Sequence, residues 1–482
     1  MKSLIVNSGN KYIDDFIKES LYSKESEYSK FLTWVPYEKF TNLEHIGKGG
    51  FSEIYKATWE RQKYVAYRGI FKTKKTEVAL KVLNDSQNVD KEFIKELKYT
   101  YQFGGFNTIQ CYGVTQIPKS KNYVFILEYA TKGDLHHFLN KNFTEITWRE
   151  KIGFLINMVE GIRKIHNEKI LHRDLHSGNI LIQDNRGIIS DLGFSQPATI
   201  DSRKSQIYGI IPYMAPELFK GRPHSYSSDV YSLGMIIWQM TSGHRPFHDQ
   251  EHGPKLILDI LDGKRPEITE DTPKCWADLM KRCWHSDPSK RPTINEIIRL
   301  SHRIYYHYRY HHYHCSEGDI KKYHPNIWLE FNEAEKKRNE MVESKKPFVK
   351  NPGYEHPNSR YYSISLNSML ESINSMISDV FPYDNLFSND HFDINNFQIV
   401  PINENSCGAE NSKKHFLDEF TEDKIIGCVV CLFVVPEPST TVALPAPILK
   451  KGFVSFALSP SGGAPSSLMF RLMFGIIMEY HL

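Results

Sequence analysis

The stretch HRDLHSGN, residues 172–179, carries an aspartate and an asparagine five positions apart, Asp174 and Asn179. Taken alone, this pair fits a hydrogen-bonded turn at the start of a helical region. A second motif, DLG, begins at Asp191 and by itself reads as a type I turn. Carboxylate and amide oxygens are, however, the ligands that Mg²⁺ prefers. The two motifs therefore indicate either two separate turns or one site lined by oxygen atoms. The sequence before them decides between these interpretations.

A lysine and a glycine-rich turn precede these motifs. Lys81 ends the apolar run VALK, and the helical pattern that follows carries Glu96 as a candidate partner, with Glu92 as the alternative. Earlier still, GKGGFSEIYKATW at 47–59 is typical of a strand, a turn and a strand. Such glycines either make a tight hairpin or let backbone N–H groups approach a phosphate. Each feature has a structural explanation alone, but all of them in this order are improbable as coincidence.

Phosphoryl transfer explains the combination. The reaction needs groups that neutralise phosphate charge, hold Mg²⁺ and orient a hydroxyl nucleophile. Lys81 supplies a point charge for the phosphates, and Glu96 would hold its ammonium group. Asn179 and Asp191 supply oxygen ligands for Mg²⁺. Asp174 can accept the proton of an attacking hydroxyl and is the candidate catalytic base.

With these residues in place, the sequence over about 40–305 resembles the eukaryotic-type protein kinases, in their tyrosine-kinase-like branch. The resemblance implies a two-lobed α+β fold, with a small strand-rich lobe with one helix at about 40–130 and a large helical lobe at about 131–305. It implies an active protein kinase that uses ATP and Mg²⁺. The leader WVPYEKF and the later segments EAEKKRN and HPNSRYYS are similar to expanded kinase families of fungi.

The resemblance also assigns the residues that contact ATP. Those of the glycine-rich loop and the strands around it are Ile46, Gly47, Lys48, Gly49, Gly50, Phe51, Ser52, Ile54, Ala79 and Lys81. The others are Leu127 as gatekeeper, Glu128 and Ala130 for adenine, Asp134 for the ribose, and Leu181. The resemblance implies further that Glu217 pairs with Arg291 and that Asp229 braces the catalytic loop.

Two positions depart from the pattern of Ser/Thr kinases. His176 stands where those enzymes usually carry a lysine, and Ile210 where they usually carry a threonine. The loop also lacks the arginine that true tyrosine kinases place there. We expect a Ser/Thr-directed enzyme that acts in signal transduction, with tyrosine or dual specificity left open. The alternative from another class is a pseudokinase that acts as a scaffold or allosteric module, and the complete set of catalytic residues argues against it.

The family resemblance implies regulation by phosphorylation. Arg173 directly precedes the candidate base, and in the family this arginine helps to form a basic pocket for a phosphate on the activation segment. Spacing favours Ser205 as the phosphorylated residue. An upstream activating kinase is therefore expected as a partner, beside a protein substrate. The alternative is that TIDSRKSQ, residues 199–206, is only a polar surface loop.

Composition favours a soluble globular protein. The chain has 482 residues, 40% hydrophobic and 24% charged, and its formal charge of +3 is too small to argue for nucleic acid as a partner. The start of the sequence lacks a signal peptide, and the longest apolar run, IIGCVVCLFVV, is about half of what a bilayer span needs. We expect no membrane segment and a cytoplasmic location, with a nuclear one as the alternative. The oligomeric state stays unknown.

The rest of the chain reads as extensions and one insertion. Residues 1–39 form an N-terminal extension, and 306–482 form a C-terminal extension expected to be largely disordered apart from an amphipathic helix at 326–341. A basic stretch before Lys81 is expected to be a solvated insertion between two strands. Because every catalytic motif lies before residue 320, a chain that ends there is expected to fold and to be active.

Overall fold

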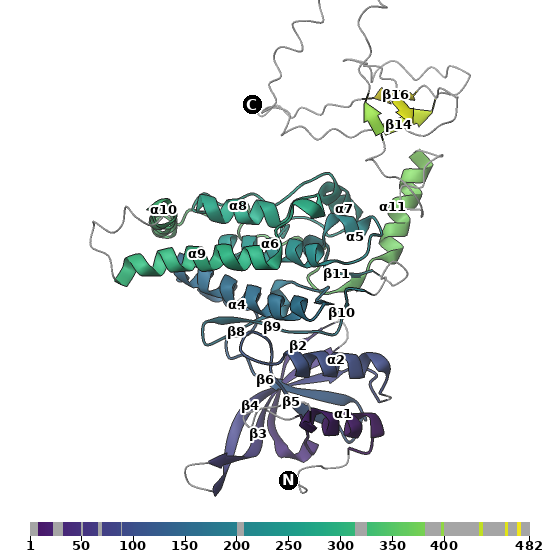
Figure 1. Cartoon of the computed structure of the whole chain (residues 1–482), viewed down its shortest axis with the longest axis vertical. Coiled ribbons are helices and arrows are strands. Elements are labelled where there is room, and N and C mark those ends of the chain that lie inside the picture. The colour runs from purple at the N-terminus through teal and green to yellow at the C-terminus, as the bar shows by residue number, and fades with distance from the viewer. Residues whose placement is uncertain are drawn as a thin grey trace, which may run out of the picture. The chain divides into compact units, whose positions relative to one another are not determined.

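The first of two compact units holds two lobes, as expected for the α+β kinase fold (Figure 1). The units are Met1–Leu386 and Phe387–Leu482 of a computed structural model. Its described residues are 8–22, 32–49, 52–65, 70–87, 89–199, 207–313 and 325–380, together with four short strands. Those strands belong to the second unit, where β13 (Phe397–Ile399) pairs with β15 (Leu458–Pro460) and β14 (Phe433–Pro436) with β16 (Phe470–Met473).

A six-stranded sheet forms the N-lobe, in the order β1-β5-β6-β4-β3-β2. Its strands are β1 (Thr33–Trp34), β2 (Phe40–Lys48), β3 (Ser52–Val65), β4 (Ile70–Leu83), β5 (Cys111–Gln116) and β6 (Tyr123–Glu128). All neighbours are antiparallel except β1 and β5. Helix α2 (Lys91–Phe103) begins after Asp90, whose carboxylate accepts the N–H of Phe93 at 2.8 Å and so caps the helix.

The basic stretch at 60–75 is paired strand over 60–65 and 70–75, and 66–69 lie outside the described residues. β3 and β4 form one hairpin whose register is unbroken from Ser52 opposite Leu83 to Val65 opposite Ile70. In Figure 1 this hairpin extends away from the C-lobe. The sequence did not predict strand in the outer half of this hairpin, because that half lacks the alternation of apolar and polar residues typical of a half-buried strand.

The residues before position 40 are part of the N-lobe where the structure describes them. Helix α1 (Lys11–Tyr22) buries Ile13 and Ile17 in one apolar cluster with Phe93 and Leu97 of α2. Strand β1 adds to the sheet beside β5. The expected boundary at residue 40 therefore divides a packed core.

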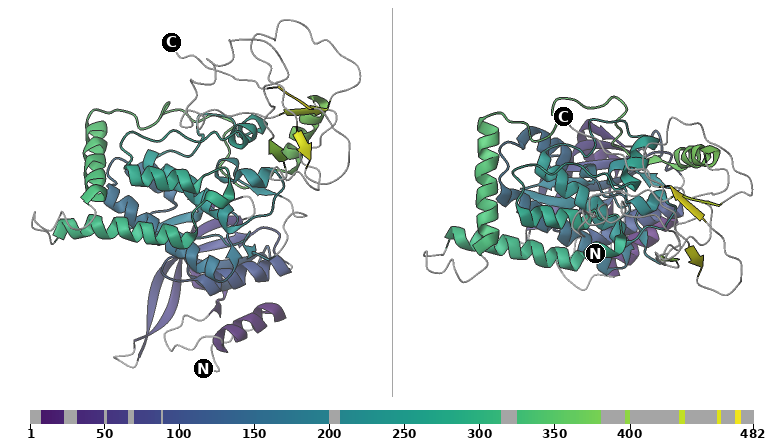
Figure 2. Two further views of the ribbon diagram at one scale, coloured as in Figure 1. Left: turned by 45° about the horizontal axis from the view of Figure 1, so that its top comes forward. Right: turned by 90° about the horizontal axis from the view of Figure 1, so that it is seen from above.

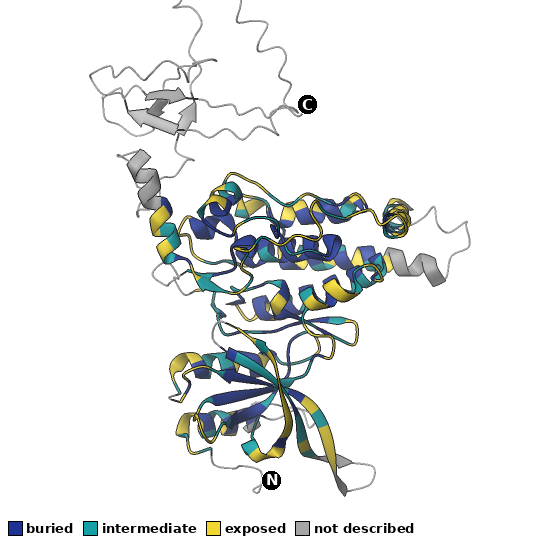
Figure 3. Ribbon diagram, turned by 180° about the vertical axis from the view of Figure 1, so that it is seen from behind, coloured by how far each residue is buried: buried dark blue, intermediate teal, exposed yellow. Residues whose placement is uncertain are grey.

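Helices dominate the C-lobe. They are α3 (Leu135–Asn142), α4 (Trp148–Asn167), α5 (Pro216–Phe219), α6 (Tyr226–Ser242), α7 (Pro254–Leu261), α8 (Lys274–Cys283) and α9 (Ile294–Tyr313). The short strands are β7 (Ile170–Leu171), β8 (Ile180–Gln183), β9 (Arg186–Ile189), β10 (Gln196–Pro197) and β11 (Tyr208–Gly209). Figure 3 shows that buried residues form the centre of each lobe.

Capping residues mark the start of α4 and the end of α6 in the sequence. Thr147 and Glu150 form a reciprocal capping box at the start of α4. Helix α6 ends at Gly243, whose φ of 78° lies in the left-handed region that glycine tolerates best.

Part of the C-terminal extension is regular structure packed on the C-lobe, while most of 381–482 lies outside the described residues. Helix α10 (Pro325–Glu343) covers the predicted helix and lies across α9 (Figure 2). Its Phe331 is fully buried against Trp148 and Trp276, with ring centroids 5.7 and 6.4 Å away. The Glu335 carboxylate accepts the backbone N–H of Trp148 at 2.7 Å. These contacts make α10 part of the C-lobe.

The chain after α10 also stays on the C-lobe. Strand β12 (Ile364–Ser365) pairs antiparallel with β11, and α11 (Asn367–Val380) follows directly. Leu366 at this junction is fully buried. Among the described helices, none combines the length and the apolar character that crossing a bilayer requires.

Candidate active site

Three charged side chains from separate elements meet beside the sheet. The Lys81 ammonium nitrogen lies 2.7 Å from Glu96 Oε1 of α2 and 2.8 Å from Asp191 Oδ1, which follows β9. The period of two along β4 turns Ala79 to the same face as Lys81. Glu92, the alternative partner, is exposed and pairs with a neighbouring lysine of its own helix. The ion pair expected between Lys81 and Glu96 is therefore present.

The cluster keeps Lys81 charged. Burial favours the neutral amine, but the Asp191 and Glu96 carboxylates outweigh it, so the pKa of Lys81 is raised above its ordinary value. Burial raises the pKa of Glu96. Burial acts the same way on Asp191, but the ammonium of Lys81 outweighs it and lowers the pKa of that carboxyl. A fixed positive charge at this position suits the binding of phosphate oxygens.

The catalytic loop is anchored by a buried histidine. His172 is fully buried, and its Nδ1 accepts the backbone N–H of Asp174 at 3.3 Å. Its Nε2 donates to the carbonyl of Ser190 at 3.0 Å. This pattern requires the neutral ring, and burial favours that form by lowering the pKa of His172. The loop and the strand before Asp191 are thereby joined.

Asp229 of α6 accepts hydrogen bonds from the backbone of the same loop, as expected. Its Oδ2 accepts the N–H of His172 at 2.9 Å, and its Oδ1 accepts the N–H of Arg173 at 3.0 Å. Arg173 has a φ of 73°, a conformation that costs energy in a residue with a side chain. The two hydrogen bonds offset that cost and fix the backbone directly before Asp174.

Hydrogen bonds join Asn179 to the catalytic loop and to the residue before Asp191. Asn179 Nδ2 donates to the carbonyl of Asp174 at 2.8 Å, which leaves its amide oxygen as the atom able to bind a cation. The Asn179 carbonyl accepts the N–H of Ser190, next to Asp191, at 2.9 Å. Within the described residues, no group of three His, Cys, Asp or Glu side chains could hold a metal. The amide and the carboxylate would thus bind a hard cation together with phosphate and water oxygens, a set that Mg²⁺ accepts.

The glycine-rich loop fits a ligand better than it fits a strained turn. Neither Gly47 nor Gly49 has a φ in the left-handed region. A Cβ at Gly47 would meet nothing within 4 Å, and one at Gly49 only Ser52, at 3.6 Å. The protein's own geometry therefore does not require glycine here, and the absent side chains leave room for a phosphate. Gly50 and Phe51 lie outside the described residues.

The remaining residues of the glycine-rich loop lie on the strands beside Gly47 and Gly49. Ile46 and Lys48 lie on β2 and Ile54 on β3, and the pairing of Gly47 with Ile54 continues the ladder into the turn. Ser52 begins β3, and its carbonyl accepts the N–H of Gly49 at 2.8 Å, which closes the turn.

The predicted adenine and ribose contacts lie at the junction of the lobes. Leu127 of β6 is paired with Ala79 of β4. The N–H of Glu128 is used by the carbonyl of Gln110, and the carbonyl of Ala130 by the N–H of Gly133. If these two residues contact adenine as expected, the Glu128 carbonyl and the Ala130 N–H are the backbone groups that these two hydrogen bonds do not use.

Asp134 also has a structural role. Its carboxylate caps α3 by accepting the N–H of His137 at 2.9 Å, and it contacts the His137 ring at 2.6 Å. Its backbone is bridged to Leu181 of β8, which places both residues at one edge of the site. A ribose hydroxyl would compete with His137 for the Asp134 carboxylate.

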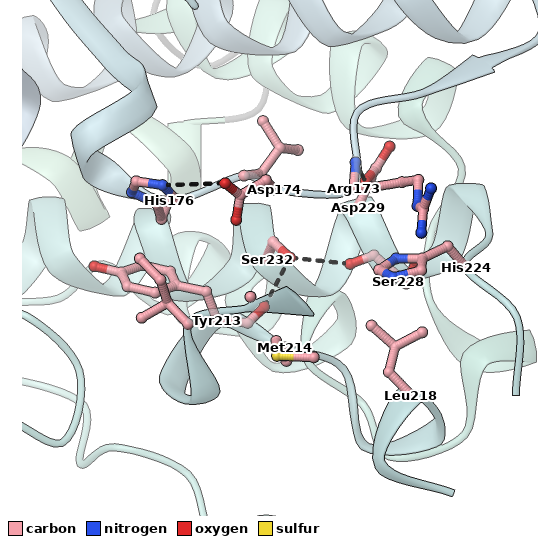
Figure 4. Close-up of a pocket in the computed structure, with 13 residues that line it drawn as sticks. Arg173, Asp174, His176, Tyr213, Met214, Leu218, His224, Ser228, Asp229 and Ser232 are labelled. Atoms are coloured by element: carbon pink, nitrogen blue, oxygen red, sulfur yellow. Dashed lines mark hydrogen bonds and ion pairs between the residues drawn. The ribbon is translucent and has the colours of Figure 1, made fainter. Parts of the chain in front are cut away.

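A pocket lies beside the catalytic loop, lined in part by Asp174, His176 and Ile210 (Figure 4). His176 Nδ1 accepts the N–H of Gly178 at 3.1 Å, so the neutral ring carries its proton on Nε2. That nitrogen lies 3.7 Å from Asp174 Oδ2. Ile210 is buried and brings no hydrogen-bonding group. An imidazole thus takes over the place next to the base where a lysine was expected for Ser/Thr kinases.

Arg173 lines the same pocket, and no ion pair joins its guanidinium to an acidic side chain in the described part of the chain. Among the described residues its Nε has no hydrogen-bond partner, and Nη1 reaches only the carbonyl of Phe194, at 3.5 Å. Burial, and then Arg173, lower the pKa of the neighbouring His224 to about 4. Ser205, the residue expected to carry the phosphate, lies outside the described residues.

Glu217 and Arg291 form the expected pair. Both guanidinium nitrogens Nη1 and Nη2 donate to the Glu217 carboxylate at 2.7 Å. The Arg291 side chain is fully buried, so the pair fixes the end of the activation segment to the core.

One contact was not anticipated. The hydroxyl of Ser363 lies 2.8 Å from both carboxylate oxygens of Asp174. No sequence signal identified it, because the two residues are 189 positions apart and Ser363 lies in the extension that lacked periodicity.

Comparison with known proteins agrees with this geometry. The sequence model of the family described as protein tyrosine and serine/threonine kinase matches residues 40–300. The chain belongs to this family. A probable serine/threonine-protein kinase of Dictyostelium discoideum is 30% identical over 285 residues, which are 56% of this chain and 12% of that protein.

Two further relatives carry kinase names. A putative serine/threonine-protein kinase/receptor of Acanthamoeba polyphaga mimivirus is 30% identical over 270 residues, 55% of this chain and 15% of that protein. Mitogen-activated protein kinase kinase kinase 7 of Homo sapiens is 27% identical over 273 residues, 55% of this chain and 42% of that protein. The likeness to this last kinase supports the tyrosine-kinase-like branch. The match covers less than half the length of each relative.

Proposed function

We propose that this chain is a protein kinase that transfers the γ-phosphoryl group of ATP to a serine or threonine hydroxyl of a protein. The observation that carries the proposal is the position of Lys81 between Glu96 and Asp191. A scaffold without catalysis does not need a buried lysine held by two carboxylates beside a braced aspartate. The names of the relatives support serine or threonine as the acceptor.

ATP would bind with its phosphates under the glycine-rich loop. Lys81 would contact phosphate oxygens, and the room above Gly47 and Gly49 would admit them. Asn179 and Asp191 would hold Mg²⁺, which supplies charge neutralisation of the phosphates when bound. Each of these residues is fixed by protein hydrogen bonds or strand pairing before any ligand arrives, which lowers the cost of ordering the site.

Asp174 would act as the base. The acceptor oxygen attacks the γ-phosphorus, the bond from that phosphorus to the β,γ-bridging oxygen breaks, and ADP leaves with the bond electrons. The hydroxyl proton passes to the Asp174 carboxylate. The N–H of His176 faces one oxygen of this carboxylate. It would orient Asp174 so that the other oxygen faces the nucleophile.

The proposal extends to the setting of the enzyme. We propose a cytoplasmic signalling role, with protein substrates and an upstream kinase that phosphorylates the activation segment. Among the described residues the Nε of Arg173 has no hydrogen-bond partner, which supports this regulation, because a phosphate there would form charge-assisted hydrogen bonds.

Asp174→Asn tests the assignment. The amide cannot accept the proton, so we expect transfer to casein to fall by about 10²- to 10⁴-fold. Affinity for ATP with Mg²⁺, measured by calorimetry, should change little. Asp184→Asn, at an exposed turn, is the matched control and should keep wild-type turnover. Wild-type protein that binds ATP but labels no substrate would instead indicate a scaffold, and phosphoamino-acid analysis of labelled casein separates serine or threonine from tyrosine.

A further inference from the structure

A segment of the C-terminal extension lies in the position of a protein substrate. The hydroxyl of Ser363 lies within 2.8 Å of both carboxylate oxygens of Asp174, the candidate base. A single hydroxyl proton can be shared between the two oxygens. In a phosphoryl transfer, the acceptor hydroxyl must make this same contact with the base. Ser363 is therefore placed as an acceptor.

Backbone pairing holds the chain in register after Ser363. In strand β12, Ile364 lies opposite Gly209 and Ser365 opposite Tyr208, both of β11 at the end of the activation segment. The N–H of Leu366 then donates to the carbonyl of Ile207 at 2.8 Å. Addition of an extended strand to an exposed edge is a common way to bind peptides. The contact of Ser363 with Asp174 is thus part of a longer docked stretch.

Side chains before Ser363 fix the other end. The hydroxyl of Tyr361 donates to the carbonyl of Pro246 at 2.9 Å, and the Arg245 guanidinium lies 3.7 Å from the centre of the Tyr361 ring. The N–H of Arg360 donates to His252 Nδ1 at 2.9 Å. Because both sides are anchored, the Ser363 hydroxyl reaches Asp174 without a search through many conformations.

We propose that residues 361–366 occupy the protein-substrate site in cis and that Ser363 is phosphorylated by the active site of its own chain. The inference rests on the proposed function and names a substrate for it. The Ser363 oxygen forms a bond to the γ-phosphorus of ATP, ADP leaves, and the Ser363 proton goes to Asp174. While the segment is docked, it excludes other protein substrates, since a tethered segment has a high effective concentration.

Phosphorylation would also end the docking. A phosphoserine carries a charge of about −1.5 to −2 and would stand beside the Asp174 carboxylate, which repels it. The strand pairing of β12 is only two residues long and cannot compensate for that repulsion alone. The modified segment would leave the site, and other substrates would enter.

The test uses the full chain after phosphatase treatment. The protein is incubated with ATP, Mg²⁺ and casein, and phosphopeptides are quantified by mass spectrometry over a hundredfold range of protein concentration. We expect phosphate at Ser363 at a rate per molecule that does not depend on protein concentration. Absence of phosphate at Ser363, or a rate that rises in proportion to concentration, overturns the inference. Labelling of casein in the same tube shows whether the proposed function stands independently.

Variants test the exclusion of other substrates. Ser363→Glu places a charge beside Asp174, so its initial rate on casein should exceed that of phosphatase-treated wild type several-fold. Ser363→Ala keeps the segment docked and removes the acceptor, so its rate should stay low after incubation with ATP. Ser365→Glu is the matched control, because Ser365 is exposed two residues further along the same strand. Equal rates for Ser363→Glu and Ser365→Glu would refute the exclusion.

Discussion

The carboxylate of Asp229 accepts the backbone N–H of Arg173 at 3.0 Å, so a core helix of the C-lobe directly fixes the residue before Asp174. The loop is thereby held in its strained conformation by an interaction that does not depend on any ligand. The same carboxylate contacts His166 Nε2 at 2.9 Å. Its charge is buried, and its acceptor capacity is used on both oxygens.

Asp229→Asn should destabilise the fold and slow turnover. The amide keeps the shape but turns an N–H₂ group toward one of the donors, which leaves that donor unpaired in the core. We expect the free energy of unfolding, from urea denaturation followed by tryptophan fluorescence, to fall by about 3 kcal/mol. Asp184→Asn, at the surface, should change it by less than about 0.5 kcal/mol. Wild-type stability in Asp229→Asn would contradict the bracing role.

Glu96→Gln should weaken catalysis with little effect on folding. Lys81 would lose one of its two charged partners and become free to turn toward Asp191 alone. A hydrogen bond to a charged group contributes about 1.5–3 kcal/mol, so we expect kcat/KM for ATP to fall by about 10- to 100-fold. The control is Glu92→Gln, on the same helix but exposed. Equal losses in the two variants would show that helix propensity, and not the ion pair, is responsible.

Phe331→Ala should unfold the C-lobe more easily. This side chain is fully buried against two tryptophans, and removal of such an aromatic group costs about 3–5 kcal/mol. A chain that ends at residue 320 loses the whole of α10, so we now expect it to aggregate or to unfold at low urea. Leu329→Ala on the same helix is the control, because Leu329 is 46% exposed. The measurement is the urea midpoint, and similar midpoints for Phe331→Ala and Leu329→Ala would argue against packing of α10.

Lys151→Met should stabilise the protein at neutral pH. Lys151 is fully buried, and among the described residues its ammonium has no hydrogen-bond partner but lies over the rings of Trp148, at 4.4 Å, and Phe143, at 4.8 Å. Burial lowers the pKa of Lys151 to about 8, so below pH 8 the folded state bears the full cost of a buried charge. We expect a gain of about 1–3 kcal/mol in the free energy of unfolding at pH 7.

The pH dependence gives this prediction its sign. Between pH 8 and the ordinary lysine value the unfolded chain binds more protons than the folded one, so the stability of the wild type rises with pH. The advantage of Lys151→Met should therefore shrink between pH 7 and pH 9.5. Lys141→Met, at an exposed lysine, should show no such trend. A gain that is the same at both pH values would count against a buried charge.

Local chemistry explains why much of the site could be predicted. The spacing of Asp174 and Asn179 is set within one loop, and the glycine-rich turn precedes Lys81 by strand geometry alone. The helix of α10 was also visible, since its apolar positions recur with helical period. The choice of Glu96 over Glu92 came from the family resemblance, because residues four apart lie on one helix face and the helical period does not separate them.

What escaped prediction depends on contacts between distant segments. Ile13 packs on Leu97, and Phe331 on Trp148, but a single apolar residue in a polar stretch carries no information about its partner. The docking of Ser363 on Asp174 depends on backbone pairing of a two-residue strand, which leaves no pattern of side chains to read.

The unbroken register of the β3–β4 hairpin limits how this protein can vary in length during evolution. Each residue of one arm is matched to one of the other, from Ser52 opposite Leu83 outward to Val65 opposite Ile70. A single-residue insertion in one arm would shift its pairing with the other arm and reverse the faces of the inserted strand relative to its partner. Length changes are therefore neutral only at the tip, or as equal additions to both arms, or as a bulge that restores the alternation before Lys81.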